Sequence, residues 1–288
     1  MTASARLGIG AGVLAVSVVF ASLGAWATVV EPERLVVRPA DVPLPRLPRA
    51  WDGLRIAAIS DIHAGSPHVG YAQLEHLVST TNEQRPDIVV LLGDYVCRRT
   101  PQEGVEKPEN VASMLAGLHA PLGVVAVLGN HDWWLDGERM RRAFEDAGLR
   151  VLDNEALRLE RGGSPLWLVG IADALTRIPR VDWALRSVPA GDAVVLLTHN
   201  PDLFDHDVPD RVMLTLAGHT HGGQVRLPFV GAPIVPSAFG QRYAEGLVVE
   251  GKRTLFVTPG IGTSVLPIRL GVPPEISLLT LTGRGAGS

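Results

Sequence analysis

The sequence predicts an α/β domain made of two stacked β-sheets with helices on the outside. Three observations predict this fold class. Short apolar runs rich in β-branched residues recur along the chain, helical patterns separate the first three of them, and the later half holds further strand-like runs with few helices. Strand–helix alternation favours right-handed crossovers and a largely parallel core. The 288 residues, 46% of them hydrophobic, are enough for one sizeable core.

The expected core strands are short and apolar throughout, as in strands that are covered on both faces. In chain order they are 54–60, 87–92, 123–128, 193–198 and 212–217. Helices are expected at 71–82, 108–118 and 137–147. Further strands are expected at 166–170, 247–250, 253–257 and 276–282. A mixed second sheet facing the first would account for this later group.

The apolar composition of residues 1–30 predicts a membrane anchor or signal segment. No charged residue occurs between Leu7 and Val30, and about 20 apolar residues can span a bilayer. A cleaved signal peptide has a shorter apolar stretch, although Ala25-Trp26-Ala27 resembles a cleavage site. The length of the run, and Trp26 at the expected interface, favour an uncleaved single-pass transmembrane helix.

Charge gives conflicting indications of orientation. Only Arg6 and the amino terminus are positive before the segment, whereas Arg34, Arg38, Arg46 and Arg49 follow it, which favours a cytoplasmic C-terminal side. The large following domain and the signal-like start favour the opposite side. We expect an extracytoplasmic domain.

The rest of the chain is expected to form a stalk, one domain and a tail. Residues 31–50 contain five prolines and predict an extended Pro-rich stalk, 51–282 form the globular domain, and 283–288 form a disordered tail. The net charge of −4 argues against a nucleic-acid partner. Cys97 is the only cysteine, so an intrachain disulfide is excluded. Nothing in the sequence predicts an oligomeric state.

A polar motif follows each of the five expected core strands. The motifs are Asp61-Ile62-His63, Gly93-Asp94, Gly129-Asn130-His131-Asp132, Thr198-His199 and Gly218-His219-Thr220-His221. The carboxyl ends of neighbouring strands meet at one edge of an α/β sheet, where ligands bind. The five motifs therefore predict one convergent site.

The residue types of these motifs suit a pair of divalent metals. Two metals about 3.5–4 Å apart are a standard device for hydrolysing phosphate esters. Asp94 is the candidate for bridging them, because the preceding glycine allows a sharp turn. Asp61 and His63 are two residues apart and would project the same way, and His219 and His221 have the same spacing. Nitrogen and oxygen ligands without thiolate suit Mn, Fe, Zn or Co.

The ordered motifs resemble those of the calcineurin-like metallophosphoesterase superfamily, which read DxH, GD, GNH(D/E), H and GHxH. More narrowly, they resemble the YkuE/YaeI-type bacterial branch, whose GHTHGGQV signature occurs here at 218–225, with a similar C-terminal stretch at 259–276. The resemblance covers nearly the whole globular domain. It implies a four-layer αββα sandwich, with two mixed β-sheets flanked by helices.

The resemblance also implies a role for each matched residue. The metal ligands would be Asp61, His63 and His221 at one metal, Asn130, His199 and His219 at the other, and Asp94 between them. His131 would bind no metal, and would stabilise the phosphoryl oxygens or protonate the leaving group. A metal-bridging hydroxide would attack phosphorus in line.

The expected function is that of a membrane-tethered phosphoesterase with two metals, acting on phosphodiester or pyrophosphate bonds. A site near a bilayer suggests lipid-linked or envelope substrates, and similar enzymes include UDP-diacylglucosamine pyrophosphatases. That substrate would require a cytoplasmic domain. One alternative is a non-catalytic scaffold, which the complete ligand set disfavours because buried unpaired charges have no packing rationale. The other is a phosphomonoesterase or protein phosphatase, disfavoured because Cys97 replaces an aspartate of that motif.

Several further residues are assigned on weaker patterns. His68, His76, His119 and His206 are expected to be structural, although His68 follows the first motif and could line the pocket. Arg98 is expected in solvent. Arg269 contacts a substrate phosphate or pairs with Glu275, and 228–246 is expected to select the substrate.

Overall fold

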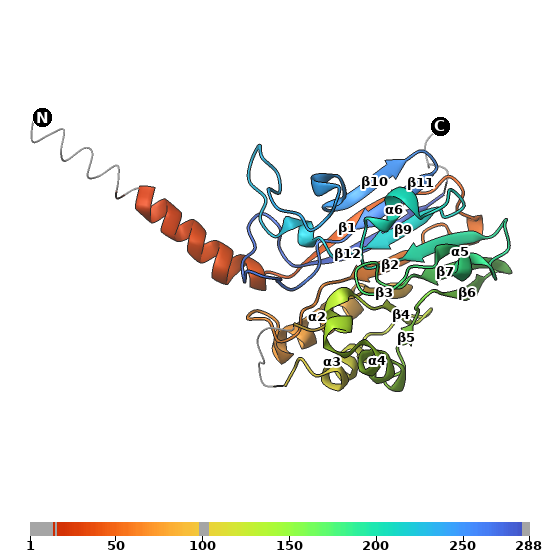
Figure 1. Cartoon of the computed structure of the whole chain (residues 1–288), viewed down its shortest axis with the longest axis horizontal. Helices are drawn as coiled ribbons and strands as arrows, with labels where there is room; N and C mark the ends of the chain where they lie inside the picture. The colour runs from red at the N-terminus through yellow and green to blue at the C-terminus, as the bar shows by residue number, and fades with distance from the viewer. Residues whose placement is uncertain (1–13, 15, 98–103, 284–288) are drawn as a thin grey trace, which may run out of the picture.

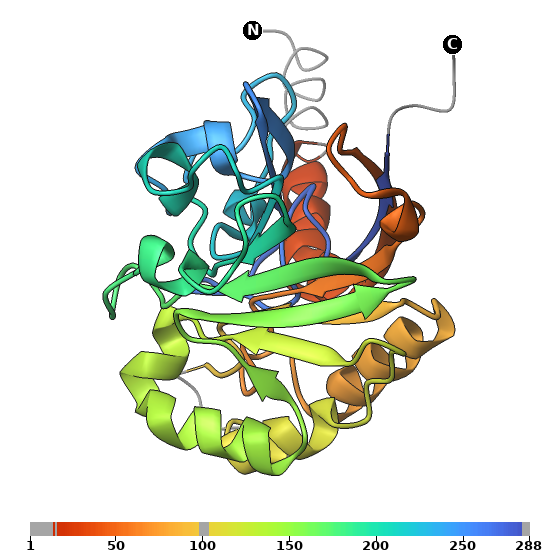
Figure 2. The same cartoon turned by 90° about the vertical axis from the view of Figure 1, so that its right-hand side faces the viewer.

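The computed structural model describes residues 14, 16–97 and 104–283, and it shows two six-stranded mixed sheets packed face to face (Figures 1 and 2). In spatial order, the first sheet contains β1 (Val36–Pro43), β12 (Glu275–Thr282), β2 (Arg55–Ile59), β3 (Ile88–Leu92), β4 (Val124–Val127) and β5 (Arg150–Val151). The second contains β10 (Gly246–Glu250), β11 (Arg253–Val257), β9 (Leu214–Ala217), β8 (Ala193–Leu197), β7 (Ser164–Gly170) and β6 (Glu155–Arg161).

Both sheets are parallel at their centres. Strands β2 to β5 run parallel, and β12 enters antiparallel to β2 and parallel to β1. In the second sheet β7, β8, β9 and β11 run parallel, while the outer strands β6 and β10 are antiparallel to their neighbours. The parallel centres follow from strand–helix–strand crossovers, which return the chain to the same end of the sheet.

Helices cover the two outer faces. The longer helices are α2 (Tyr71–Glu83), α3 (Pro108–Leu115) and α4 (Asn130–Asp146), which pack on the first sheet, and the shorter α5 (Val181–Leu185) and α6 (Leu203–His206) contribute to the core on the second. Alternate residues of β2 point to opposite sides: Ile59 packs toward the helices, and Ile56 packs between the sheets. The layers are therefore helix, sheet, sheet and helix, and the predicted pair of mixed sheets flanked by helices is confirmed.

The five expected core strands are all present, and each predicted range contains or overlaps the observed strand. Their residues are buried on both faces, which explains why they are apolar throughout instead of alternating. Two strands were not predicted in the middle of the chain. Strand β5 has only two residues, and the edge strand β6 reads EALRLER, with charges on its exposed side.

Residues 31–50 do not form a separate stalk. Strand β1 lies at their centre and pairs with β12 over eight residues. Val42, Leu44 and Leu47 are buried in the core between the sheets. Prolines 39 and 43 fit here because an edge strand has a side that needs no backbone donor. The prediction of a stalk is therefore wrong for this segment, which belongs to the domain.

The N-terminal apolar run is helical where it is described, at residues 16–25, and it continues as a π-helix over Trp26–Val30. It projects from the domain in Figure 1. Among the described residues, no helix is both long and apolar enough to cross a bilayer. The first part of the expected anchor (1–13 and 15), Arg98, and residues 284–288 of the expected tail lie outside the described residues.

Candidate metal centre

The five motifs meet at the carboxyl ends of the central strands of both sheets. Asp61 follows β2, Asp94 follows β3, Asn130 follows β4, His199 follows β8 and His219 follows β9. Backbone hydrogen bonds join these segments across the strands. The amide of Asp61 donates to Gly93 at 2.9 Å and that of Gly218 donates to His199 at 3.0 Å. The convergence expected from strand ends is present.

Three groups of side chains have ligand atoms within 4.8 Å of one another, close enough to hold a metal ion. They are Asp61, His63 and His221; His63, Asp94 and His131; and Asp94, His199 and His219. Oδ2 of Asp94 lies 3.2 Å from Nε2 of His199 and 3.7 Å from Nε2 of His63. Because His63 and Asp94 are shared between groups, the groups form one continuous cluster.

Several ligand atoms of the cluster are buried without a hydrogen-bond donor among the described residues. Oδ1 of Asn130 accepts no hydrogen bond there, and Oδ1 of Asp61 accepts none either, although it lies 3.3 Å from Nε2 of His221. An unsatisfied buried polar atom costs about 1–3 kcal/mol, so such atoms call for a partner. Two imidazole nitrogens, Nε2 of His63 and of His221, face each other at 3.2 Å. These donor atoms fit divalent cations.

Burial makes three of the imidazoles neutral. It lowers the pKa of His63 and of His219 to about 3, and lowers the pKa of His221 well below its ordinary value. A neutral imidazole keeps a lone pair on one ring nitrogen, which is the form that binds metals. The environment therefore keeps these rings in the form that can bind a metal.

Asp94 and His199 behave as a charged pair. Burial opposes ionisation of Asp94, but the adjacent His199 holds the pKa of its carboxyl below the usual range. Burial likewise disfavours the cationic His199, but Asp94 raises its pKa to about 10. The other nitrogen of His199, Nδ1, lies 2.7 Å from the carbonyl oxygen of Leu92. Donation from Nδ1 to this carbonyl directs Nε2 toward the cluster, where it could bind a cation once it loses the second proton of the charged ring.

Burial raises the pKa of Asp61 to about 6. Its second oxygen, Oδ2, accepts the backbone N–H of His219 at 2.8 Å. That hydrogen bond directs Oδ1 toward His221. The backbone of the fifth motif therefore orients the Asp61 carboxylate of the first motif, although His219 lies 158 residues further along the chain.

The fourth residue of the third motif, Asp132, is a positioning residue to which the sequence pattern assigned no role. Its Oδ2 accepts the backbone N–H groups of Asp94 and Gly129, each at 2.9 Å, and its Oδ1 accepts that of Tyr95 at 2.8 Å. The carboxylate thus caps the N-terminus of α4 and holds the Asp94 turn. The D/E alternative in the motif was the signal, since both residues carry the carboxylate that this cap needs.

The backbone of the site adopts strained conformations. Five of the seven expected ligands have left-handed φ angles: 52° at Asp61, 48° at His63, 57° at Asp94, 71° at His219 and 53° at His221. Each such conformation costs on the order of 1–3 kcal/mol, and strain of this kind gathers at functional sites. The surrounding contacts therefore hold these side chains in directions that relaxed backbone would not give.

Two glycines allow the motif segments to approach each other. A Cβ atom at Gly218 would lie 1.9 Å from Oγ of Ser60 and 2.6 Å from Oδ2 of Asp61. A Cβ atom at Gly93, where φ is +94°, would lie 2.6 Å from the Gly129 amide nitrogen. Any other residue at these positions would push two motif segments apart, so the glycines of the motifs have a steric function.

His131 lies at the edge of the cluster. Its backbone N–H donates to Oδ1 of Asp94 at 2.8 Å, and its ring lies edge-on to His63, with centroids 4.6 Å apart. The ring also packs on the exposed Trp134. The geometry brings His131 within ligand distance of Asp94 and His63, and its expected role as a residue that binds no metal stays a prediction.

Arg269 fits neither of its two predicted roles. Its guanidinium group is fully buried and donates to the backbone carbonyls of Pro259, Gly262 and Val272. Glu275 pairs instead with Arg38 at 2.6 Å. Arg269 therefore ties together the loop that packs behind Asp61. An arginine within the C-terminal motif stretch suggested a contact with a substrate phosphate. The guanidinium group of Arg269 instead donates to backbone carbonyl groups that would otherwise lack donors.

His68 does not belong to the cluster. Its Nε2 lies 3.2 Å from the carbonyl oxygen of Pro267, and its Nδ1 lies 3.8 Å from the carboxylate of Glu33. It therefore links the first motif loop to the N-terminal segment, as a structural role predicts.

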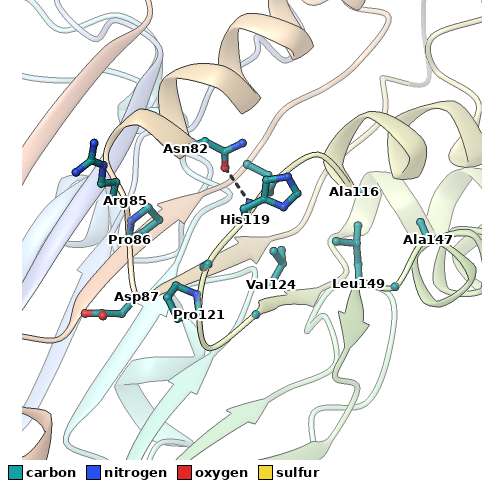
Figure 3. Close-up of a pocket in the computed structure, with 14 residues that line it drawn as sticks. Asn82, Arg85, Pro86, Asp87, Ala116, His119, Pro121, Val124, Ala147 and Leu149 are labelled. Atoms are coloured by element: carbon teal, nitrogen blue, oxygen red, sulfur yellow. Dashed lines mark hydrogen bonds between the residues drawn. The ribbon is translucent and has the colours of Figure 1, made fainter.

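A hollow of about 670 Å³ lies away from the metal centre, at the amino ends of β3 and β4 (Figure 3). Two of its polar side chains are already paired: Asn82 accepts the backbone N–H of His119, and Asp87 accepts that of Arg55. None of the seven expected ligands lines this hollow, so the candidate site is identified by the chemistry of the cluster and not by the size of a cavity.

Comparisons with known proteins agree with this geometry. Residues 54–223, which contain all five motifs, match the family described as calcineurin-like phosphoesterase. The chain is 30% identical over 258 residues to the uncharacterized metallophosphoesterase YkuE of Bacillus subtilis, covering 89% of this chain and 88% of YkuE.

Two further relatives carry names that state an activity. The phosphodiesterase YaeI of Escherichia coli is 33% identical over 235 residues, covering 79% of this chain and 82% of YaeI. The UDP-2,3-diacylglucosamine pyrophosphatase LpxG of Chlamydia trachomatis is 29% identical over 310 residues, covering 88% of this chain and 91% of LpxG.

The sandwich and its buried cluster of carboxylates and imidazoles define a metal-dependent phosphoester hydrolase, with a phosphoester as its substrate. The matched segment reaches from β2 to the last of the five motifs. The chain belongs to the calcineurin-like phosphoesterase family.

Proposed function

We propose that this chain is a membrane-tethered enzyme with two divalent metals that hydrolyses phosphodiester or pyrophosphate bonds of lipid-linked or envelope substrates. The observation that carries the proposal is the sharing of His63 and Asp94 between neighbouring groups of ligand atoms. A cluster with shared members suits two adjacent metals better than one. The activities for which YaeI and LpxG are named support a diester or pyrophosphate, and that of LpxG supports a lipid-linked substrate.

Seven residues would hold the metals in this proposal: Asp61, His63 and His221 at one, Asn130, His199 and His219 at the other, and Asp94 at both. Mn, Fe, Zn or Co suits these nitrogen and oxygen ligands. When bound, such metals lower the pKa of water and polarise phosphoryl oxygens.

The protein residues position the reacting groups. Asp94 has one oxygen fixed by the His131 amide, and so presents the other to His63 and His199. The His131 ring, at the N-terminus of α4, would donate to the phosphoryl oxygens or protonate the leaving oxygen. The N-terminus of a helix favours negative charge, which suits a phosphate at this position.

The membrane tether rests on the N-terminal apolar run. Apart from the buried Ala27, its described residues are exposed on the surface of the helix, including Val16, Val19, Phe20 and Leu23. Exposed apolar side chains along a whole helix favour a lipid environment. We propose a single-pass anchor with the domain on the extracytoplasmic side.

The test is an assay of the purified full-length chain loaded with Mn²⁺, using bis-p-nitrophenyl phosphate and p-nitrophenyl phosphate. We expect cleavage that a chelator abolishes and metal restores, with the diester preferred. Preference for the monoester would support a phosphomonoesterase. The absence of cleavage with Mn²⁺, Fe²⁺, Zn²⁺ and Co²⁺ would support the non-catalytic scaffold.

A further inference from the structure

Two loops beside the metal centre expose large apolar side chains to an unusual degree. In the loop 227–235 the side chain of Phe229 is fully exposed, Ile234 is 79% exposed and Val230 is 58% exposed. In the loop 264–267 Val265 is 81% exposed and Leu266 is 57% exposed. Single exposed apolar residues are ordinary, but a contiguous group of them marks an interaction site. We call these two loops the apolar rim.

The two loops of the apolar rim form one surface. The side chain of Gln224 donates to the carbonyl oxygens of Leu266 and Ile268 and accepts the amide of Ser264. Backbone bonds reinforce this link, from the amide of Arg226 to Leu270 at 2.7 Å and from the amide of Leu270 to Gln224 at 2.9 Å. The exposed side chains are therefore held on a fixed frame.

The N-terminal helix ends against the same surface. The amide of Arg269 donates to the carbonyl oxygen of Ala27 at 2.9 Å, which joins the helix end to the segment directly after the second loop of the rim. Figures 1 and 2 both show the helix next to these loops. The uncharged helix and the apolar rim are thus continuous, and a bilayer that held one would meet the other.

The rim is also continuous with the metal centre. Its first loop follows His221 within a few residues, and a Cβ atom at Gly223 would lie 2.7 Å from Cβ of Ala232. Its second loop follows Gly262, where a Cβ atom would lie 2.8 Å from Cβ of His63. Contacts this close leave no space between the rim and the segments that carry the ligands.

The charge of the rim suits a lipid surface. Residues 224–240 and 261–274 contain no Asp or Glu, and their charged residues are Arg226 and Arg269. Arg269 is buried, whereas Arg226 lines a hollow of about 490 Å³ together with Leu227, Pro228 and Phe229. The carboxylate of Glu245, which lies outside these stretches, pairs with Arg226. An apolar surface whose acidic neighbour is paired with an arginine enters the headgroup region with little repulsion from anionic lipids.

We propose that the apolar rim is a membrane-contact surface, which inserts Phe229, Ile234 and Val265 into the bilayer interface and sets the metal centre at the level of the lipid headgroups. The occupant is the bilayer in which the N-terminal helix is held. The consequence of this contact for the reaction rests on the proposed function: an amphiphilic phosphoester would reach the metals while its acyl chains stay in the membrane.

Insertion can be measured independently of activity. In a Cys97→Ser background of the full-length chain, Phe229→Cys and Val265→Cys are labelled with an environment-sensitive nitrobenzoxadiazole dye and reconstituted with phosphatidylethanolamine–phosphatidylglycerol vesicles. We expect blue-shifted emission that lipids carrying a nitroxide on the acyl chain quench. The matched control is Ser187→Cys, an exposed residue next to α5. Unquenched dye at 229 and 265, on protein that floats with the vesicles, would overturn the proposal and leave the rim as a protein-binding surface.

A kinetic comparison tests the consequence. The double variant Phe229→Ser/Val265→Ser should cleave bis-p-nitrophenyl phosphate at the rate of the unmodified chain. Its rate on a diacyl phosphodiester in vesicles should be at least tenfold lower than that of the unmodified chain. Leu247→Ser/Val249→Ser, on the edge strand β10, is the matched control with exposed apolar residues elsewhere. Equal rates on the vesicle substrate would contradict the inference. Failure of all forms to cleave the soluble diester would contradict the proposed function instead, while the dye measurement still decides the membrane contact.

Discussion

The carboxylate of Asp132 accepts the backbone N–H of Asp94 at 2.9 Å, and this contact fixes the turn that carries the central carboxylate of the site. Three backbone donors converge on Asp132, so two motif segments share one acceptor. Removing the acceptor would release both the turn after β3 and the first turn of α4.

Asp132→Asn is expected to weaken metal binding about 10–100-fold, the usual effect of losing a residue that orients a ligand. An amide would place an N–H group against a backbone N–H, which costs about 1–3 kcal/mol of unfolding free energy. Calorimetric Mn²⁺ titration and thermal unfolding of the chelator-treated protein measure the two effects. Asp146→Asn, exposed at the end of the same helix, is the control. Unchanged Mn²⁺ affinity would refute the positioning role.

Asp94→Asn is expected to reduce turnover to background and to lower the metal content at both positions. The reason is that Asp94 is shared between groups of ligand atoms and an amide cannot balance two cations. Metal analysis of the purified variant, alongside the diesterase assay, provides the measurement. Asp207→Asn, at an exposed position, should behave as the unmodified chain. Full turnover in Asp94→Asn would be incompatible with the two-metal assignment.

His131→Ala is expected to lower kcat about 10²–10⁴-fold, the range for losing a general acid, while the bound metal stays unchanged. The decisive comparison is kcat against metal stoichiometry in the same preparation. His119→Ala, an exposed histidine remote from the cluster, serves as the control. Loss of one metal would instead make His131 a ligand, which its distance from Asp94 and His63 allows.

Arg269→Lys is expected to destabilise the fold by about 1–3 kcal/mol, because a lysine cannot donate to three carbonyls in the geometry of a guanidinium group. Chemical unfolding of the two forms measures this difference. The exposed Arg142→Lys should change stability little. A raised KM with unchanged stability would restore the phosphate-contact role that burial of Arg269 argues against.

A chain that begins at Trp51 is expected to be less stable than one that begins at Glu31. The shorter chain lacks β1 and the buried side chains of Val42, Leu44 and Leu47, each worth about 1.5–3 kcal/mol. Thermal unfolding of both forms gives the comparison. Equal melting temperatures would show that residues 31–50 contribute nothing to the domain.

The ranges of the core strands, and the position of each candidate ligand directly after a strand, could be predicted because both depend on local pattern. A strand covered on both faces is apolar throughout, and the residue after it lies at the sheet edge. Pairing between distant segments left no such pattern. The register of β1 with β12 joins residues more than 230 positions apart, and a segment with three prolines from 39 to 45 resembles a linker in isolation.

The cluster of candidate ligands was predictable from the sequence, and the residues that support it were not. The candidate ligands are residue types that metals select, whereas Asp132 acts through backbone amides that any sequence carries. Arg269 was misinterpreted for the related reason that its partners are carbonyl groups, which sequence cannot distinguish from a phosphate. The left-handed φ angles at Asp61 and at the four other candidate ligands that share this conformation also could not be predicted, because these residue types do not indicate a positive φ.

The position of β12 between β1 and β2 has a consequence for the order in which the protein matures. Residues 275–282 follow the other strands of this sheet in the chain, and they must insert between β1 and β2, which are synthesised earlier. Until the ribosome has released them, β2 lacks a neighbour on one side, and the loop that carries Asp61 cannot settle. A chain translated only as far as β11 would therefore leave one edge of β2 unpaired, so the metal centre could form only after β12 has entered the sheet.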